Sequence, residues 1–329
     1  MSREGPKGSK SMLKRFLCLL AVLMMLLPAA LGESTAPEAG AFPVLNDEGF
    51  LDVGEFVYAN DDTGIWRYVD DQLKIEIYRR HGKNQKGNNA TWYEAEVWSR
   101  GDEVWQLFTN VEGKYMSQAD NPYRVARKNQ LILGINTDYA QSRYSNRKKD
   151  NRIGIILRNG KAISDVTLKS TSKKWPPLDV LALYPDGSME VYDSDEHTLQ
   201  EYIDMGVQST LAFGPYLIRD GVRNEADVSS MSTANNPRTA IGMIEKGHTF
   251  AVMVEGRVEG SVGSNLVFLA DLMAQKGCTV AFNLDGGRTA CLTFMGEQIS
   301  AVENGPNARP TTELLGIGVS ELVPDYEKK

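Results

Sequence analysis

Three two-residue turns between short apolar segments constrain the fold of this chain most. They are Asn159-Gly160, Asp186-Gly187 and Asp220-Gly221. Asn-Gly and Asp-Gly dipeptides readily adopt the positive φ angles that tight hairpins require. Three such hairpins predict a largely antiparallel sheet.

Two further segments have the pattern of strands. Leu73, Ile75 and Ile77 alternate with polar or amphipathic neighbours, and residues 92–98 form a second, aromatic-rich and partly alternating run. The polar, Gly- and Asn-rich residues 81–90 between them predict a loop.

Helical spacing is rare in this sequence. Apolar residues recur at helical spacing at Leu266, Leu269, Ala270 and Met273. Ser264 is the expected N-cap of this helix and Gly277 its C-terminal stop. A shorter helix is expected over residues 196–205, ended by Gly206. Because strands and helices do not alternate regularly, we expect an α+β class, as one sheet-rich domain with hairpins and few helices.

The N-terminus predicts an export signal. Residues 1–15 carry five Lys and Arg against one acidic residue, residues 16–27 are all apolar, and Ala30 and Gly32 supply small residues at the exit. This pattern is typical of a signal peptide over residues 1–32. The apolar run is shorter than the ~18 or more apolar residues that a membrane span needs. An uncleaved anchor is the alternative. We expect residues 33–54 to be a linker or lead, and residues 55–323 to form the domain of a secreted or envelope protein.

Charge and composition exclude several classes. The chain has 36 Lys and Arg against 43 Asp and Glu, a net charge of −7, and removing residues 1–32 leaves −11. Such a balance argues against nucleic acid as a partner. Three Cys without C-x-x-C and three His without H-E-x-x-H argue against a zinc site. Whether Cys278 and Cys291 pair stays open.

Two polar clusters adjoin apolar segments: one follows such a segment at residues 136–138, and the other precedes one at residues 237–238. Asn136 and Asp138 end the apolar run from Leu131, where alternation places both side chains on one side. The alternative is an ordinary strand exit. Pro237 stiffens the approach to Arg238, which could present its planar donors to a phosphate or carboxylate. A surface arginine is the alternative.

Two more clusters lie towards the C-terminus. Glu255 and Arg257 flank one glycine, and Ser261 lies just before the predicted helix, whose first turn would favour an anion. The alternative is a capped helix with a surface charge pair. Asp285 precedes two glycines that would let the backbone approach a ligand beside a carboxylate. A hairpin turn fits the same residues.

Taken in chain order, these clusters form a recognisable set. The motifs are N-x-D-[YF], G-P-x-L-x-x-D-G, P-R-T-A-I-G, [DE]-G-R-x-x-x-S-x-G and N-L-D-G-G. The set resembles the phosphodiester glycosidase family over roughly residues 55–320. The resemblance implies hydrolysis of a sugar that is joined through its anomeric oxygen to a phosphodiester. It also implies bacterial relatives that are exported and associated with envelope or exopolysaccharide glycans.

The resemblance implies a site that is assembled from all five motifs. Its residues would be Asn136, Asp138, Gly214, Arg238, Glu255, Arg257, Ser261, Asp285, Gly286 and Gly287. Asn304 and Arg309 match a weaker C-terminal pattern. Thr137 stands where the family often has glycine, Glu255 where it usually has aspartate, and Arg288 follows the last motif where the family commonly continues Gly-Ser-Ser. We expect Arg288 to bring charge to the substrate-binding residues.

The expected chemistry divides these residues between phosphate and sugar. Arg238 and Arg257 would bind the phosphate, and Asp285 would act at the anomeric centre as nucleophile or base. Asp138 or Glu255 would be the second carboxylate. No cofactor is expected to be required, and a divalent cation on oxygen ligands is the alternative. The expected partner is a sugar-phosphodiester or glycan substrate, with the oligomeric state open. A non-catalytic module that binds sugar phosphates is the competing function.

Overall fold

Each predicted turn closes an antiparallel hairpin. β7 (Gly154–Arg158) pairs with β8 (Lys161–Val166), β9 (Asp179–Leu183) with β10 (Met189–Tyr192), and β12 (Tyr216–Arg219) with β13 (Val222–Arg223). Asn159 and Asp220 have φ angles of 46° and 52°, as two-residue turns of this type require. The two-residue turn predicted at Asp186-Gly187 is wrong, because Leu183 pairs with Met189 and residues 184–188 form a longer loop. The computed structural model describes residues 40–139, 154–166, 177–231, 233–301, 303 and 307–326. Within them the fold is sheet-rich α+β, as predicted.

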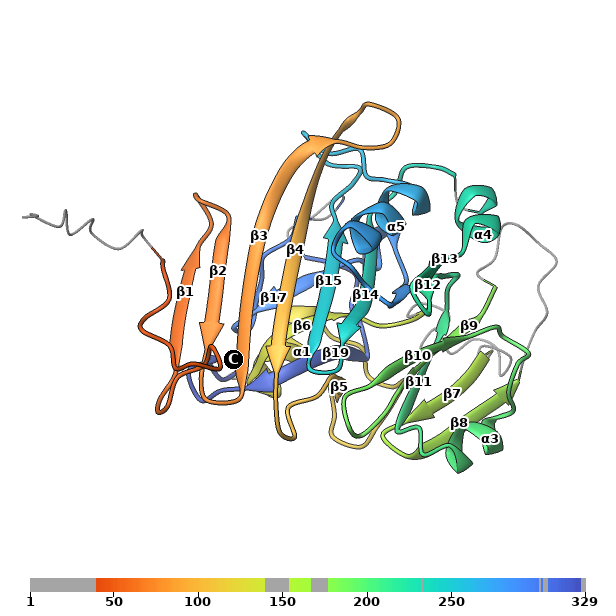
Figure 1. Cartoon of the computed structure of the whole chain (residues 1–329), viewed down its shortest axis with the longest axis horizontal. Helices are drawn as coiled ribbons and strands as arrows, with labels where there is room; N and C mark the ends of the chain where they lie inside the picture. Colours follow the sequence, from red (N-terminus) through yellow and green to blue (C-terminus); the bar gives the residue numbers. More distant parts are fainter. Residues whose placement is uncertain are drawn as a thin grey trace, which may run out of the picture. The chain divides into compact units, whose positions relative to one another are not determined.

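The described strands form two large sheets and two small ones (Figure 1). The nine-stranded sheet has the order β1-β2-β3-β4-β15-β14-β16-β12-β13, and the five-stranded sheet the order β18-β17-β6-β19-β5. β11 (Ser209–Phe213) joins β9 and β10 in a three-stranded sheet, and β7 and β8 form the fourth. The remaining strands of the nine-stranded sheet are β1 (Phe56–Asn60), β2 (Ile65–Val69), β3 (Leu73–Lys83), β4 (Asn89–Ser99), β14 (Arg238–Glu245), β15 (His248–Val254) and β16 (Val280–Asn283). The five-stranded sheet consists of β5 (Gln106–Thr109), β6 (Leu131–Asn136), β17 (Leu292–Phe294), β18 (Glu297–Gln298) and β19 (Glu313–Val319).

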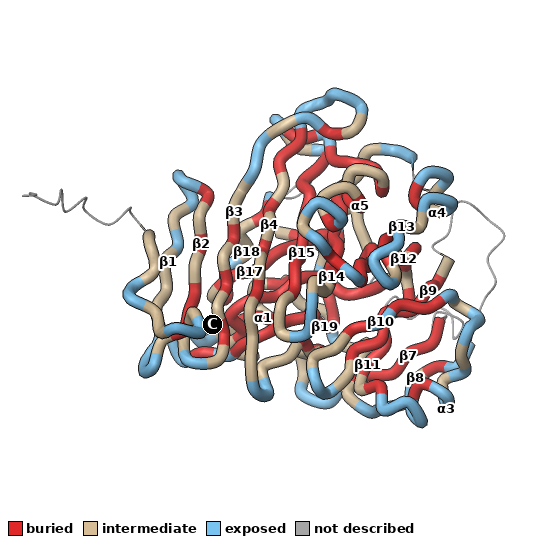
Figure 2. The backbone as a smooth tube through the Cα atoms, in the orientation of Figure 1, coloured by how far each residue is buried: buried red, intermediate tan, exposed pale blue. Residues whose placement is uncertain are grey.

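Strand alternation divides the core into two main clusters. Ile241 and Ala251 belong to a cluster that joins both large sheets, whereas their neighbours Ala240 and Val252 pack with helix α5 (Leu266–Gln275). β14 and β15 are therefore buried on both faces over most of their length. Figure 2 shows this as continuous buried backbone, in contrast to the exposed tip of the β3–β4 hairpin.

The N-cap of the principal helix lies one residue later than predicted. Asn265, not Ser264, is the N-cap of α5, and its side chain accepts a hydrogen bond from the N–H of Phe268 over 3.1 Å. The backbone of Ser264 is instead paired with Asn236, through two N–H···O bonds of 3.0 Å. Gly277 follows the C-cap with a φ of 88°, as predicted.

The sequence pattern predicts the shorter helices less well. The helix expected over residues 196–205 is α3 (Leu199–Asp204), which begins after a capping box formed by Thr198 and Glu201. α1 (Pro122–Lys128) and α4 (Glu225–Ser230) were not predicted, because helices of six or seven residues are too short to show helical periodicity.

The loop expected over residues 81–90 is wrong. β3 continues to Lys83 and β4 begins at Asn89, so only the residues between them form the turn. The hairpin tip is held by distant contacts, since Asn84 Nδ2 donates to the Gly263 carbonyl over 2.8 Å and the N–H of Val262 donates to the Asn89 carbonyl over 3.1 Å. Tertiary contacts thus extend two polar strands that sequence pattern alone does not reveal.

The predicted signal peptide lies outside the described residues, as does the start of the predicted lead. From residue 40 the lead packs on the nine-stranded sheet: the Phe42 ring lies 6.0 Å from that of Phe56, and Arg67 donates to the Gly40 carbonyl. In the part of the chain that the structure describes, no helix is long and apolar enough to span a membrane. Cys278 and Cys291 are buried free thiols, and burial raises the pKa of both to about 12.

Candidate active site

Antiparallel register brings three of the polar clusters together where the central strands of the nine-stranded sheet end, which we call the strand-end edge. Arg238, the first residue of β14, is paired with Val254, the last residue of β15, so Glu255 follows beside it. β16 pairs with the other side of β14 and ends at Asn283, so Asp285 emerges at the same edge. The start of one strand lies beside the ends of its two antiparallel neighbours, which is why residues 238, 255 and 285 come together.

Pro237 is the point at which these three segments touch. The N–H of Gly287 donates to the Pro237 carbonyl over 3.0 Å. A Cβ atom on Gly286 would lie 2.6 Å from that carbonyl oxygen, and a Cβ atom on Gly256 would lie 2.8 Å from the Pro237 nitrogen. Only glycine permits such close backbone approach, so the glycines of two motifs serve to pack them against the third.

The Asp285 segment connects a strand of one large sheet to a strand of the other and does not close a hairpin. β16 belongs to the nine-stranded sheet and β17 to the five-stranded sheet, and a 3₁₀ turn over Gly287–Thr289 lies between them. The hairpin alternative for Asp285 is therefore wrong. The crossing leaves Asp285 partly accessible, with its Oδ1 accepting from the N–H of Gly286 over 2.9 Å.

Asn136 holds the backbone of Asp285. Its Nδ2 donates to the Asp285 carbonyl over 2.8 Å, and its Oδ1 accepts from Thr239 Oγ1 over 2.7 Å and from the N–H of Cys291 over 3.0 Å. The side chain is fully buried. Its polar atoms are thus occupied by the chain itself, in a position that connects the first motif to the third (P-R-T-A-I-G) and to the last.

Asp138 contacts a different part of the molecule from Asn136. Its Oδ1 accepts from Arg158 Nη2 over 2.8 Å and its Oδ2 from the N–H of Ala212 over 2.7 Å. Arg158 Nε also donates to Glu313 Oε1 over 2.8 Å, and all three side chains are at most 2% exposed. Asn136 and Asp138 therefore do not face one ligand together. The residues that the structure describes contain no group of three or more His, Cys, Asp or Glu arranged to hold a metal ion.

Arg238 and Arg257 lie close enough for their charges to interact. Arg238 is 6% exposed, and its Nε and Nη2 each donate over 3.2 Å, to the carbonyls of Ser264 and Ala234. Burial and the charge of Arg257 lower the pKa of Arg238 to about 10, while the charge of Asp285 acts in the opposite direction. Arg257 is held at a φ of 59°, where it donates to Glu303 Oε2 over 2.8 Å and to Asn236 Oδ1.

Glu255 is a buried carboxylate that is fixed through one oxygen. Its Oε1 accepts from Tyr93 Oη over 2.9 Å and from the N–H of Ala301 over 2.7 Å. Among the described residues no hydrogen-bond donor reaches Oε2. Burial raises the pKa of Glu255, while the hydrogen bonds from Ala301 and Tyr93 oppose the increase.

Ser261 and Thr91 fix the backbone of Glu255. Ser261 Oγ donates to the Glu255 carbonyl over 2.7 Å and accepts from the N–H of Thr91 over 2.9 Å. The N–H of Glu255 donates in turn to the Thr91 carbonyl over 2.9 Å. Because Ser261 is 1% exposed, it supports Glu255 from the interior.

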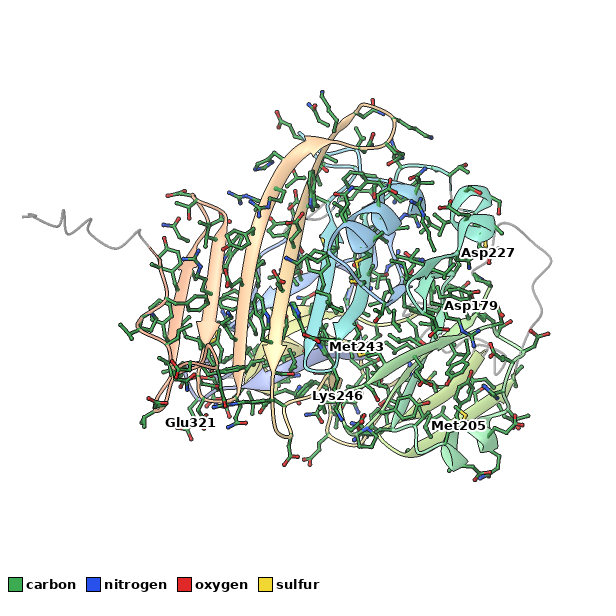
Figure 3. The ribbon with its side chains drawn as sticks, in the orientation of Figure 1. Asp179, Met205, Asp227, Met243, Lys246 and Glu321 are labelled. Atoms are coloured by element: carbon green, nitrogen blue, oxygen red, sulfur yellow. The ribbon has the colours of Figure 1, made fainter. Side chains whose placement is uncertain are left out.

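Gly214 is connected to the same edge through Asn283. Asn283 Nδ2 donates to the Gly214 carbonyl over 2.7 Å, and the N–H of Gly214 donates back to the Asn283 carbonyl over 3.2 Å. Gly214 has a φ of 78°, and a Cβ atom there would lie 2.9 Å from Cβ of Asp179, a buried carboxylate labelled in Figure 3. Asp179 and Tyr93 were missed by sequence reasoning, since nothing separates either one from other strand residues.

The last two predicted arginines are neighbours. The N–H of Arg309 donates to the Arg288 carbonyl over 2.7 Å, which places the C-terminal motif beside the Asp-Gly-Gly turn. The Arg288 side chain is exposed. Asn304 lies outside the described residues.

The fold and this strand-end cluster of carboxylates, arginines and glycines define the class of the protein. The family model for phosphodiester glycosidases matches residues 129–318. The chain therefore belongs to the phosphodiester glycosidase family, as the ordered motifs indicated.

Solved structures share the fold at low sequence identity. The catalytic domain of zebrafish N-acetylglucosamine-1-phosphodiester alpha-N-acetylglucosaminidase, auto-inhibited by its pro-peptide, is 15% identical with a TM-score of 0.57, and the match covers 81% of this chain and 89% of that one. A Burkholderia pseudomallei protein named "Putative exported protein" is 10% identical with a TM-score of 0.50, and the match covers 84% and 98% of the two chains.

One curated relative matches part of the chain. An uncharacterized SPbeta prophage-derived protein of Bacillus subtilis (strain 168), YomE, is 30% identical over 129 residues. The match covers 39% of this chain and spans a fifth of that relative's length.

Proposed function

We propose that this protein is an exported hydrolase that cleaves the bond between the anomeric carbon of a sugar and a phosphodiester. The observation that carries the proposal is the grouping of Arg238, Arg257 and Asp285 at the strand-end edge where Glu255 is also held. Family membership supports the same reaction class.

The two arginines suit the leaving group. A phosphate monoester leaves as a stable anion, so neutralising its charge matters more than strong protonation of its oxygen. Arg238 is fixed by two backbone carbonyls, and the charge of Arg257 lies close enough to lower its pKa. An anion between them would relieve this repulsion and accept hydrogen bonds from both planar groups.

Asp285 and Glu255 are the two carboxylates of the proposed reaction. Asp285 is partly accessible beside Arg238 and would act at the anomeric carbon as nucleophile or as base for water. Glu255 keeps Oε2 available, and its raised pKa lets it carry a proton more readily than an exposed glutamate. Asp138 was the other candidate, but its oxygens bind Arg158 and Ala212, so we assign it to the support of the fold.

The substrate is proposed to be a sugar phosphodiester of an envelope or exopolysaccharide glycan. The predicted signal peptide supports an extracytoplasmic substrate, and one protein of similar fold is named "Putative exported protein". Arg288 is exposed beside the Asp-Gly-Gly turn, where its charge would favour an aglycone with a further negative group.

Release of reducing sugar tests the reaction directly. The purified protein is incubated with N-acetylglucosamine phosphodiesters and nucleotide sugars, and free sugar is measured over time. We expect release, and a fall of about a hundredfold for Arg238→Ala, since losing a transition-state charge partner costs on the order of 3 kcal/mol. Arg80→Ala is the matched control, because that arginine pairs with Glu94 at the surface, with its side chain 47% exposed.

Two results would overturn the assignment. A fall of less than tenfold for Arg238→Ala would remove its role at the phosphate. Saturable binding across the panel without any release would show a sugar-phosphate-binding module instead of an enzyme. Full turnover after exhaustive chelation is expected if no exchangeable cation takes part.

A further inference from the structure

The Tyr93 hydroxyl has one proton to donate and lies within hydrogen-bond distance of two acceptors. Its Oη lies 2.9 Å from Glu255 Oε1 and 2.8 Å from the Ile299 carbonyl oxygen. A phenol donates only one hydrogen bond, so Tyr93 cannot serve both acceptors at once. The side chain is 2% exposed, which excludes bulk water as the partner of the acceptor that is left over.

The protonation state of Glu255 decides which acceptor Tyr93 serves. When Glu255 is ionised, the Tyr93 hydroxyl donates to Oε1, beside the donation from the N–H of Ala301 over 2.7 Å. When Oε1 carries a proton, that proton can be donated to Tyr93 Oη, and the Tyr93 hydroxyl turns to the Ile299 carbonyl. Both arrangements keep the same heavy atoms in contact, so the change needs only the rotation of one O–H bond.

We propose that Tyr93 is a positioning residue for Glu255, which holds the carboxyl group through Oε1 in both protonation states and leaves Oε2 available to substrate. This inference rests on the proposed function. The two acceptors of Tyr93 Oη lie on different elements, Glu255 just after β15 and Ile299 just after β18. Loss of its hydroxyl would withdraw a donor from the ionised carboxylate and leave the packing of the ring in place.

Other charged groups around Glu255 come from β3. Arg79 and His81 both act on the carboxylate electrostatically and favour its ionised form. Arg79 is anchored to Asp61 Oδ1 over 2.9 Å, and His81 Nδ1 lies 3.0 Å from Thr91 Oγ1. Among these neighbours, Tyr93 is the one that hydrogen-bonds to the carboxyl group and can reverse the direction of the bond.

The test compares Tyr93→Phe with Tyr78→Phe. Tyr78 is also in the nine-stranded sheet, but its hydroxyl donates to Glu76 and accepts from Arg67, so it is the matched control. The pH dependence of kcat and of kcat/KM is measured for both variants. We expect the limb of the pH profile that depends on Glu255 to move to higher pH by about one unit in Tyr93→Phe and to stay in place in Tyr78→Phe, because only Tyr93→Phe removes a hydrogen bond to the Glu255 carboxylate.

A second measurement separates this inference from the proposed function. The Glu255 carboxyl carbon is followed by ¹³C NMR in protein labelled at glutamate, with its resonance assigned from Glu255→Gln. An upward shift of its titration in Tyr93→Phe supports the role of Tyr93 even if no sugar is released. Unchanged titration and an unchanged pH profile overturn it, even if the wild-type protein is an active hydrolase.

Site-specific 3-fluorotyrosine at position 93 covers the case in which Tyr93→Phe does not fold. The more acidic phenol is a stronger donor to the ionised carboxylate, so the titration of Glu255 is expected to move to lower pH. A shift in the same direction as that expected for Tyr93→Phe would contradict the proposal.

Discussion

Arg158 Nη2 donates to Asp138 Oδ1 over 2.8 Å, and neither side chain is more than 1% exposed. The same guanidinium donates to Glu313, so one buried cation holds carboxylates from two distant parts of the chain. Burial disfavours the charged form of Arg158, but the two carboxylates more than compensate and raise its pKa. The pair connects β7 with the segment that follows β6.

Removing this cation should be costly. We expect Arg158→Met to lower the free energy of unfolding by about 3–5 kcal/mol, because it leaves two buried carboxylates without a counter-charge. Arg219→Met is the control, since Arg219 binds Glu196 over 2.7 Å in a partly exposed pair and should lose no more than about 1 kcal/mol. Urea unfolding measures both. Similar losses in the two variants would contradict a special role for Arg158.

Glu255 and Asp138 are the two candidates for the second carboxylate, and substituting them should affect different properties of the protein. Glu255→Gln is expected to reduce turnover of a sugar phosphodiester about a hundredfold with little change in stability, because the amide keeps the acceptor that Tyr93 and Ala301 use. Asp138→Asn is expected to lower the melting temperature and retain most of the turnover per folded molecule. Turnover and thermal melting are measured on both variants, and the opposite pattern would restore Asp138 as the reacting group.

Gly263 should tolerate alanine less well than Gly160. Both have positive φ angles, 91° and 78°, so alanine strains either backbone by roughly 1–2 kcal/mol. A Cβ atom on Gly263 would also lie 2.5 Å from the Asn236 carbonyl, whereas the space beside Gly160 is open. We expect Gly263→Ala to cost more in urea unfolding and to reduce turnover by displacing Arg238. Equal effects in both assays would show that close packing at Asn236 is unimportant.

Asp179 should make stability depend on pH. Burial raises the pKa of Asp179 to about 7, and the nearby charges of Asp193 and Asp227 add to the effect, while the N–H of Tyr216 opposes it (Figure 3). Because the folded state binds the proton more tightly than an unfolded carboxyl group near pH 4, this contribution to stability is present at low pH and falls as pH rises from about 4 to about 7. The slope is up to about 1.4 kcal/mol per pH unit.

Asp179→Asn should reduce that decline. Denaturant unfolding at intervals from pH 4 to pH 8 is expected to show a flatter profile for Asp179→Asn than for the wild-type protein. Asp186→Asn is the control, since its exposed carboxylate has a pKa lowered by Lys246 and takes no part in this pH window. A wild-type decline that persists unchanged in Asp179→Asn would assign it to other groups.

The sequence by itself determined the local features of this protein. Asn-Gly and Asp-Gly turns, alternating strands and the apolar spacing around Leu269 depend on neighbouring residues, and so they predicted the hairpins, the sheet-rich class and helix α5. The ordered motifs also indicated the family, because their residues and order survive in the linear chain even where Thr137 and Glu255 differ from the usual pattern.

Only the tertiary structure decided how the polar residues divide between those that support the fold and those that we propose for the chemistry. Asn136, Asp138 and Ser261 look like ligands in sequence, but folding gives each a hydrogen-bond partner in another strand: Thr239, Arg158 and Thr91 respectively. Tyr93 looks like an ordinary core aromatic, yet register places its hydroxyl against Glu255. Burial and hydrogen-bond partners arise from tertiary contacts, such as Asn136 with Asp285 and Tyr93 with Glu255, whose residues are 149 and 162 positions apart. No local pattern records such contacts, and they determine which carboxylates we propose as the reacting groups.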